Sequence, residues 1–207
     1  MQTCFLPHTL PYDGRQLRSL WCYEQTNEPG DCIIAFIGAM DVSTHMVDME
    51  DVLQCDYIKS TLALNFIVEL FHINLETTVL YQRKLVTIIK DVLDNLGVFG
   101  TCLIQLGDDL MYKNPNDKDL YKLSVSIATG STFSGLIHTA VNILPTPNMP
   151  LKIISLKEMY EIQNNVTESN ESFLDRNLVE FIGRKIIDGF ASEVTSIKRA
   201  TTKVRSV

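Results

Sequence analysis

The sequence predicts an α+β fold, in which helices pack on a mixed and largely antiparallel sheet. Residues 121–128 and 136–143 alternate between polar and apolar side chains and are separated by a short loop rich in Gly, Ser and Thr. That pattern is typical of an antiparallel hairpin. Residues 77–97 instead place apolar side chains at intervals of three and four, as an amphipathic helix does. Strands of period two beside helical segments indicate the α+β class.

Length and composition are those of a folded domain. The chain has 207 residues, of which 45% are hydrophobic and 21% are charged, enough for one sizeable core or two small subdomains. Three prolines, Pro145, Pro147 and Pro150, interrupt regular structure late in the chain. We therefore interpret residues 1–207 as a single domain, with a core over about 30–145 and a C-terminal helical extension over about 151–207.

Charge and cysteine content restrict the partners and the compartment. The net charge is −7 and the isoelectric point is about 5.1, whereas general nucleic-acid-binding surfaces are basic, so we expect no nucleic-acid partner. No apolar run approaches the ~18 residues of a membrane span, and the start lacks the basic and apolar stretches of a secretion signal. The five cysteines are odd in number and form no CxxC pair, which favours reduced thiols in a cytoplasmic protein.

The first third of the chain predicts a strand, a short helix and a second strand. Residues 32–38 form a continuous apolar run that ends at a glycine, as in a buried strand. Residues 47–60 are acidic with loose helical spacing, and residues 62–73 are rich in Phe, Ile and Val, which favours a strand. Within that strand, Glu69 and His72 could pair as a structural hydrogen bond or belong to a site, because a buried carboxylate needs a partner.

The next segment predicts a helix followed by a strand that ends in two acids. The amphipathic helix stops at Gly97, a residue suited to a left-handed cap. Residues 101–107 have the composition of a buried strand and lead into Asp108 and Asp109. If the strand continued, the two acids would point opposite ways, and at most one would enter a given site. A carboxylate there could hold Mg²⁺, a ribose or an amine, or the pair could simply open a turn.

The two alternating strands carry the candidate site. If their apolar faces pair, the polar residues of both strands share the second face. Its small side chains would leave room for a ligand near the backbone, and its lone lysine would attract a carboxylate or a phosphate. The alternative interpretation is the wet side of an antiparallel sheet. The polar set consists of Lys122, Ser124, Ser126, His138 and Asn142.

The C-terminal part predicts two helices. Ser155 and Glu158 have the spacing of a capping box. A longer helix is predicted over about 173–197, with an apolar stripe that serves either the core or a partner.

Common catalytic signatures are absent. No G-x-G-x-x-G, Walker A, HExxH or G-x-S-x-G pattern occurs. The acids near His45 could bind a metal, but their irregular spacing favours a solvated helix face. The sequence therefore assigns no metal ligand.

Several motifs nevertheless resemble known families. The segments YDGRQLRSLW, MVDMEDV, FIVELF and GDDL…KLSVSIAT…IHTAVNI look like those of an uncharacterised family of small microbial proteins. Residues 79–143 are also distantly similar to biotin and lipoate protein ligases, which belong to the class II synthetase-like folds. Those enzymes have, in order, a helix, a strand ending in Asn-Asp, a hairpin, a lysine that opens a strand, and a strand ending in Gly-x-Asn. Here Asp108 replaces the Asn, and no Gly/Arg-rich adenylate-binding loop precedes the helix.

The resemblance implies an enzyme that activates a carboxylate with ATP and Mg²⁺ and then transfers the acyl group. It places Lys122 where the ligase lysine contacts the reacting carboxylate and phosphate of an acyl-adenylate, and Asp109 where the ligase Asp would help to place metal or nucleotide. Asp108, Ser124, Ser126, His138 and Asn142 are then the candidate substrate-binding residues. Two alternatives are a binding module that kept the pocket without the chemistry, and an interaction protein that forms a homo-oligomer through its C-terminal helix. We expect a small-molecule ligand and no membrane partner.

Overall fold

Two β-sheets organise the part of the chain that the computed structural model describes, which is residues 1–43, 45–54, 58–100, 102–165 and 175–205. Five helices accompany them in these ranges. In chain order the elements are β1 (Gln2–Phe5), α1 (Trp21–Thr26), β2 (Cys32–Val42), α2 (Met49–Gln54), β3 (Ile58–Phe71), α3 (Leu75–Leu96), β4 (Leu103–Leu106), β5 (Asp109–Lys113), β6 (Leu120–Lys122), β7 (Ser124–Gly130), β8 (Ser134–Asn142), α4 (Leu156–Asn164) and α5 (Arg176–Thr201).

The larger sheet has five strands in the order β1-β2-β3-β8-β7. Its β1–β2 pair is parallel, and the other three pairs are antiparallel. The smaller sheet is an antiparallel meander in the order β4-β5-β6. The predicted α+β class, with a mixed and largely antiparallel sheet, is therefore confirmed.

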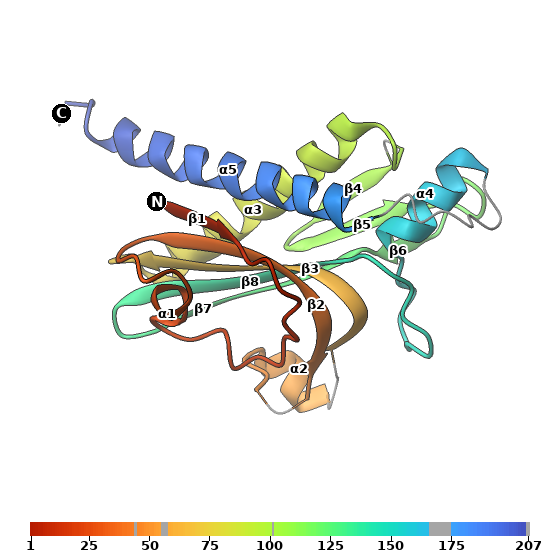
Figure 1. Cartoon of the computed structure of the whole chain (residues 1–207), viewed down its shortest axis with the longest axis horizontal. Coiled ribbons are helices and arrows are strands. Elements are labelled where there is room, and N and C mark those ends of the chain that lie inside the picture. Colours follow the sequence, from red (N-terminus) through yellow and green to blue (C-terminus); the bar gives the residue numbers. More distant parts are fainter. Residues whose placement is uncertain (44, 55–57, 101, 166–174, 206–207) are drawn as a thin grey trace.

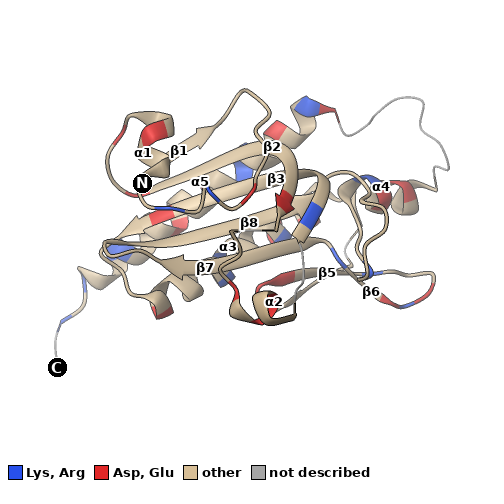
Figure 2. Cartoon of the chain, turned by 90° about the horizontal axis from the view of Figure 1, so that it is seen from below, with Lys and Arg blue, Asp and Glu red and all other residues tan. Residues whose placement is uncertain are grey.

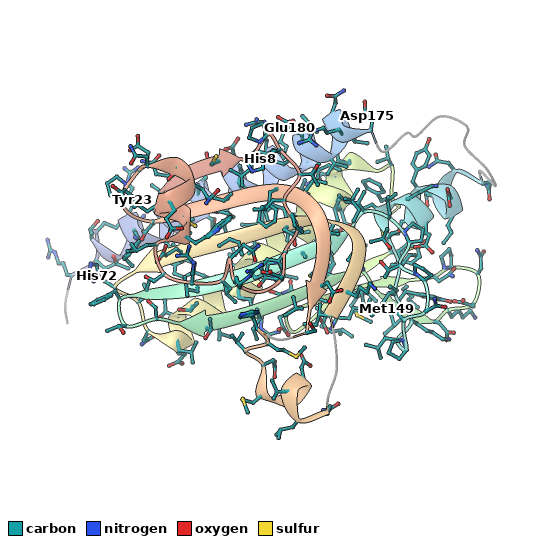
Figure 3. All side chains as sticks on the ribbon, turned by 60° about the horizontal axis from the view of Figure 1, so that its bottom comes forward. His8, Tyr23, His72, Met149, Asp175 and Glu180 are labelled. Atoms are coloured by element: carbon teal, nitrogen blue, oxygen red, sulfur yellow. The ribbon has the colours of Figure 1, made fainter. Side chains whose placement is uncertain are left out.

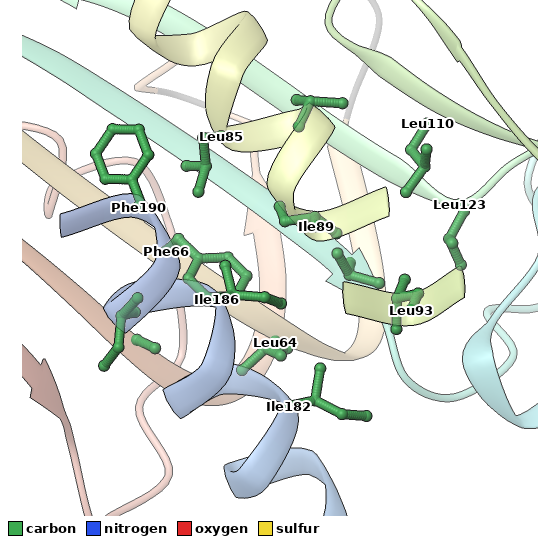
Figure 4. Packing of buried hydrophobic residues seen from close by; sticks show 14 of the residues in the cluster. Leu64, Phe66, Leu85, Ile89, Leu93, Leu110, Leu123, Ile182, Ile186 and Phe190 are labelled. Carbon is green, nitrogen blue, oxygen red and sulfur yellow. The ribbon is translucent and has the colours of Figure 1, made fainter. Parts of the chain in front are cut away.

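Helices α3 and α5 cover one face of the larger sheet (Figure 1). Their apolar stripes and the sheet residues beneath them form the main hydrophobic cluster. Burying such a side chain contributes about 1.5–3 kcal/mol, so this layer is the main source of stability. Figure 4 shows side chains of this layer, among them Leu64 and Phe66 of β3, Leu85 and Ile89 of α3, and Ile186 and Phe190 of α5.

The opposite face of the sheet is only partly covered. The N-terminal segment crosses it beside α1, and Trp21, Phe36 and Met40 belong to a second, smaller cluster there. Helix α2 lies on the same side of the sheet as α1 (Figure 1), and none of its side chains is buried. The part of this face that the second cluster leaves open holds the candidate site.

Most predicted elements are present, with shifted ends. The strand predicted over residues 32–38 extends to Val42, and Gly97 caps α3 in the left-handed conformation with φ 69°. The capping box of Ser155 and Glu158 is confirmed. The short acidic helix spans only Met49–Gln54, and Ile58 already begins β3; residues 55–57 of that prediction lie outside the described residues.

Two predictions, for the long C-terminal helix and for β4, need qualification. The long C-terminal helix begins at Arg176 after the N-cap Asp175, and residues 173 and 174 of its predicted start lie outside the described residues. Strand β4 was expected to be buried, but only Leu103 of its four residues is. The expectation was wrong because β4 belongs to the small sheet, which leaves Ile104 and Leu106 exposed.

No helix in the described ranges combines the length and the apolar character that crossing a bilayer requires.

Candidate functional site

A cavity of about 300 Å³ lies on the partly covered face of the sheet. Its walls come from the N-terminal segment, the segment that carries α2, the strands β2 and β6 to β8, and the loop between β8 and α4. Figure 3 shows Met149, which lines the cavity from that loop, at the end of the sheet away from His72. Tyr12, Met40, Val42 and Val125 form part of its apolar lining.

Lys122 stands at the rim of the cavity and is held by backbone pairing on both sides. It pairs with Met111 of β5. On its other side its N–H donates to the carbonyl of Lys152 at 2.8 Å, and its own carbonyl accepts from the N–H of Ile154 at 3.0 Å. The Lys122 Nζ lies 2.8 Å from Oδ1 of Asp109, and both side chains are about 70% buried. The backbone therefore fixes where this ammonium group sits.

Asp108 and Asp109 both line the cavity. The condition under which only one acid would enter the site is not met, because the strand does not continue through them. Strand β4 ends at Leu106, and Gly107 and Asp108 form the turn into β5. Gly107 has φ 66°, a conformation that glycine adopts without steric cost.

Helix α3 holds Asp108 from behind. Arg83 Nη1 lies 3.0 Å from one carboxylate oxygen of Asp108, and Gln82 Nε2 donates to the other at 3.1 Å. Burial raises the pKa of Asp108, and the charge of Arg83 opposes that effect. Asp108 is thus tied to the helix, whereas Asp109 is tied to Lys122.

The floor of the cavity contains a buried histidine. The ring of His138 stacks on that of Tyr12, with centroids 3.6 Å apart and an interplanar angle of 14°. Its Nε2 lies 3.1 Å from Oδ1 of Asn65. Burial lowers the pKa of His138 to about 3, so the ring is neutral at physiological pH. Asn142 lies four residues further along β8 and donates from Nδ2 to the carbonyl of Ile154 at 3.2 Å.

The predicted shared polar face is wrong. Ser126 pairs with Thr139 and Ile127 pairs with His138, so each serine lies on the face opposite to His138 and Asn142. Ser124 accepts a hydrogen bond from the N–H of Leu110 at 2.9 Å and does not line the cavity. Ser126 borders the cavity at the edge of the sheet, but its hydroxyl bonds to Thr139 and Gln82. Both serines therefore make structural hydrogen bonds beneath α3.

Glu69 and His72 are not partners. Glu69 is buried and accepts from the hydroxyls of Ser19 and Ser134 and from the N–H of Leu20, at 2.8 to 3.0 Å. His72 is exposed and follows the end of β3 with φ 58°. The pairing fails because β3 ends at Phe71 and the turn at His72 leaves its side chain at the surface. Neither side chain lines the cavity.

The rim of the cavity is acidic. Two lysines face five carboxylates among the described lining residues, and α2 and the start of β5 both carry acids at this edge (Figure 2). No group of three or more His, Cys, Asp or Glu side chains within the described ranges is arranged to hold a metal ion. Mg²⁺, however, is usually held by one or two carboxylates together with substrate phosphates. Asp108 and Asp109, next to the ammonium group of Lys122, provide that smaller donor set.

Four residues of the site were not predicted. Tyr12 and Asn65 build the floor, Lys59 is the second lysine of the rim, and Arg83 anchors Asp108. An amide within the apolar run of β3 was a signal for Asn65, because a buried amide needs partners. Tyr12 gave no such signal, because it reaches the site through a bridge to Met40.

Comparison with known proteins agrees with this fold. An uncharacterised protein of Methanocaldococcus jannaschii is 32% identical to this chain over 209 residues, which cover 98% of the chain and 84% of that protein. The solved structure of a protein of unknown function from Pyrococcus horikoshii matches with a TM-score of 0.81 at 27% identity. The match covers 100% of this chain and 98% of the other.

Biotin protein ligases share the fold at lower identity. The enzyme from Leishmania major, solved in complex with biotinyl-5-AMP, matches with a TM-score of 0.56 at 11% identity and covers 97% of this chain and 84% of that one. The resemblance to biotin and lipoate protein ligases is therefore confirmed for the fold.

A family model matches residues 1–205. Because this match spans nearly the whole sequence, the chain belongs to the family described as "Domain of unknown function (DUF366)".

Proposed function

We propose that this protein binds a small carboxylic acid in the cavity and activates it with ATP for acyl transfer. The observation that carries the proposal is the position of Lys122. Its ammonium group stands at the rim of a cavity whose floor is apolar and uncharged, with Asp109 2.8 Å away. An apolar body on the floor and a carboxylate at the lysine would match both parts of the cavity.

Each candidate residue has a role in this proposal. Lys122 would bind the carboxylate and stabilise the negative charge that develops during activation. Asp109 would orient that lysine, and Asn142 and His138 would position the body of the acid. Ser124 and Ser126 would act indirectly, by holding β7 in place.

ATP would supply the adenylyl group that activates the acid, and Mg²⁺ would offset the charge of the phosphates. Asp108 and Asp109 are the carboxylates that would hold the ion. That a ligase of this fold binds biotinyl-5-AMP supports the same reaction class here. The free thiols of the described cysteines support our further proposal of a cytoplasmic protein.

The acidic rim favours a second candidate function. Five carboxylates repel a nucleotide unless a cation is bound with it, and Asp109 already neutralises Lys122. These features suit a module that binds the small ligand but does not convert it chemically. The two candidates differ only in whether ATP is consumed.

Thermal unfolding with added ligands tests the proposal. Biotin, lipoate and octanoate, each with and without ATP and Mg²⁺, should raise the melting temperature, because a ligand at 100 times its Kd stabilises the native state by about 2.7 kcal/mol. Lys122→Met should abolish the shift. Lys113→Met, which removes an exposed lysine of β5 outside the cavity lining, is the matched control and should keep it.

Exchange of pyrophosphate into ATP separates the two candidates. An activating enzyme catalyses acid-dependent exchange, and Lys122→Met should slow it at least ~10²-fold, as the loss of a group that stabilises a transition state does. Ligand binding without exchange would exclude the activating enzyme and support the binding module. A wild-type protein whose melting temperature responds to none of these acids contradicts both candidates for them.

A further inference from the structure

Behind His138, the histidine of the cavity floor, lies a buried amide whose orientation is determined by its neighbours. Asn65 Nδ2 lies 3.3 Å from the carbonyl oxygen of Gly38 and 3.2 Å from that of Ala63. Carbonyl oxygens only accept hydrogen bonds, so the group that faces both must be the NH₂. The oxygen Oδ1 of Asn65 therefore faces His138, 3.1 Å from its Nε2.

This orientation fixes the tautomer of His138. An amide oxygen only accepts, so Nε2 must carry the hydrogen. The ring is neutral, and its other nitrogen, Nδ1, is then an acceptor with a free lone pair. Burial keeps the ring in this state, because it lowers the pKa of His138 to about 3.

Nδ1 is the ring nitrogen left for a ligand. Within the described residues, Nδ1 has no hydrogen-bond partner, since Nε2 makes the one hydrogen bond of this ring. Nδ1 is also not fully buried. Among the described residues, the one fully buried side-chain nitrogen or oxygen that lacks a hydrogen-bond partner is Oδ1 of Asp94. His138 is 3% exposed and lines the cavity. Nδ1, unpaired on a residue that lines the cavity, is thus the ring nitrogen available to a ligand there.

We infer that Nδ1 of His138 accepts a hydrogen bond from an N–H or O–H group of the ligand, so that the substrate class is acids whose apolar body carries such a donor. This inference rests on the proposed function, since it concerns the acid that Lys122 binds at the rim. His138 is then a specificity residue, because its Nδ1 stays without a hydrogen bond when a plain alkyl acid is bound. A buried acceptor left unpaired by the wrong ligand costs binding free energy, and that cost is the source of discrimination.

The strand geometry indicates where the donor sits in the ligand. His138 and Asn142 lie on the same face of β8, four residues apart, which is about 13 Å along a strand. Asn142 donates its N–H to the carbonyl of Leu123, the neighbour of Lys122. The donor therefore belongs near the end of the acid that is distant from the carboxylate. Tyr12, stacked on His138, covers one face of the imidazole against the ligand.

Two matched pairs of ligands test the inference on the wild-type protein. Octanoate and 8-hydroxyoctanoate differ in one terminal hydroxyl. Lipoate and biotin differ in their ring systems, but both are acids with a sulfur-containing ring, and of the two only biotin carries N–H donors. Titration calorimetry should show the donor-bearing acid of each pair binding roughly ten-fold or more tightly. In His138→Phe, which keeps a ring against Tyr12 and removes the acceptor, the two acids of each pair should bind with about equal affinity.

Nitrogen NMR of wild-type protein labelled at its histidines provides a second readout, which needs no substitution. Free protein should show His138 as the Nε2–H tautomer, with an unprotonated Nδ1. Adding 8-hydroxyoctanoate should shift the Nδ1 resonance, and octanoate should leave it nearly unchanged. A protonated Nδ1 in the free protein, or equal affinities within both ligand pairs, would overturn the inference.

The outcome is distinguishable from failure of the proposed function. If no acid binds but the neutral 1,8-octanediol shifts the Nδ1 resonance, the acceptor role of His138 holds and the proposed role of Lys122 fails. If the acids bind in a Lys122-dependent way without shifting Nδ1, the proposed function holds and this inference fails.

Discussion

Lys122 shows how the chain keeps a charged residue in one position. Pairing with β5 on one side and with the segment of Lys152 and Ile154 on the other leaves its backbone little freedom. Asp109 then restricts the side chain. Ion pairs that water still reaches contribute only about 0–1 kcal/mol to stability, and both side chains of this pair keep roughly 30% of their surface exposed. The value of the pair lies in positioning the ammonium group, which is what ligand binding requires.

The buried ring of His138 leads to a prediction about how the stability of the protein depends on pH. The groups that face its ring are Tyr12 and Asn65, and both are uncharged at physiological pH. Unfolding restores the ordinary histidine pKa of about 6.5, whereas the folded value is about 3. Between these values the unfolded chain binds a proton that the folded chain does not. Stability from this residue is therefore complete above about pH 6.5 and is lost as pH falls, at about 1.4 kcal/mol per unit.

Denaturant unfolding between about pH 7 and about pH 5 measures this loss before most carboxylates protonate. The wild-type protein should lose stability over that range, and His138→Phe should lose clearly less. His72→Asn, which removes an exposed histidine, should behave as the wild type does. Equal slopes for wild type and His138→Phe would show that burial of His138 does not determine the acid sensitivity.

At the scale of elements, strand β2 places the floor of the cavity. The register of β2 against β3 shifts between Gly38 and Met40. Next to this irregularity, Tyr12 bridges Met40 and the carbonyl of Gly38 accepts from Asn65. The N-terminal segment passes so close that a Cβ on Gly38 would lie 1.7 Å from the carbonyl oxygen of Leu10. Only glycine fits there, and the position of Tyr12 over His138 depends on it.

Gly38→Ala should therefore destabilise the protein by at least roughly 1–3 kcal/mol, because backbone atoms rather than a flexible side chain must move. The midpoint of chemical unfolding measures the effect. Gly130→Ala is the matched control, since a Cβ there approaches nothing closer than the carbonyl oxygen of Ser134 at 4.0 Å. A Gly38→Ala protein as stable as this control would mean that the N-terminal segment can move away without cost.

At the scale of the whole molecule, α5 joins the same core as the sheet. Ile182, Ile186 and Phe190 are fully buried in the main cluster beside β3 and α3. Gly183 lets the helix approach closely, because a Cβ there would lie 2.6 Å from the ring of Phe5. The buried part of the apolar stripe predicted for core or partner therefore serves the core, whereas Phe181 and Ile197 of the same stripe are exposed. Assembly through the buried part would require the core to open.

Two substitutions in α5 test this arrangement. Ile186→Ala should cost about 2–5 kcal/mol, as the loss of a fully buried side chain does. Phe181→Ser, at a side chain that is 46% exposed, should change stability by no more than about 0.5 kcal/mol. Light scattering of both wild type and Phe181→Ser should give the same mass. A lower mass for Phe181→Ser would restore the hypothesis of assembly through α5.

The sequence by itself determined most of the larger elements and their order, but not β1, α1, β5 or β6. Helix α3 with its cap at Gly97, the strands β2, β3, β7 and β8, and the helices after the proline-rich segment all follow from local periodicity and capping residues. The resemblance placed Lys122 and Asp109 together, and the structure brings their side chains to 2.8 Å.

Only the tertiary structure decided which side chains share a face. Alternation within one strand says nothing about which residue of the next strand stands opposite, because that register depends on the loop between them. Ser124 and Ser126 therefore face α3, whereas His138 and Asn142 face the cavity. The floor needs Tyr12 and Asn65, which approach His138 from distant parts of the sequence. Such contacts form only when the sheet assembles, since no local pattern encodes them.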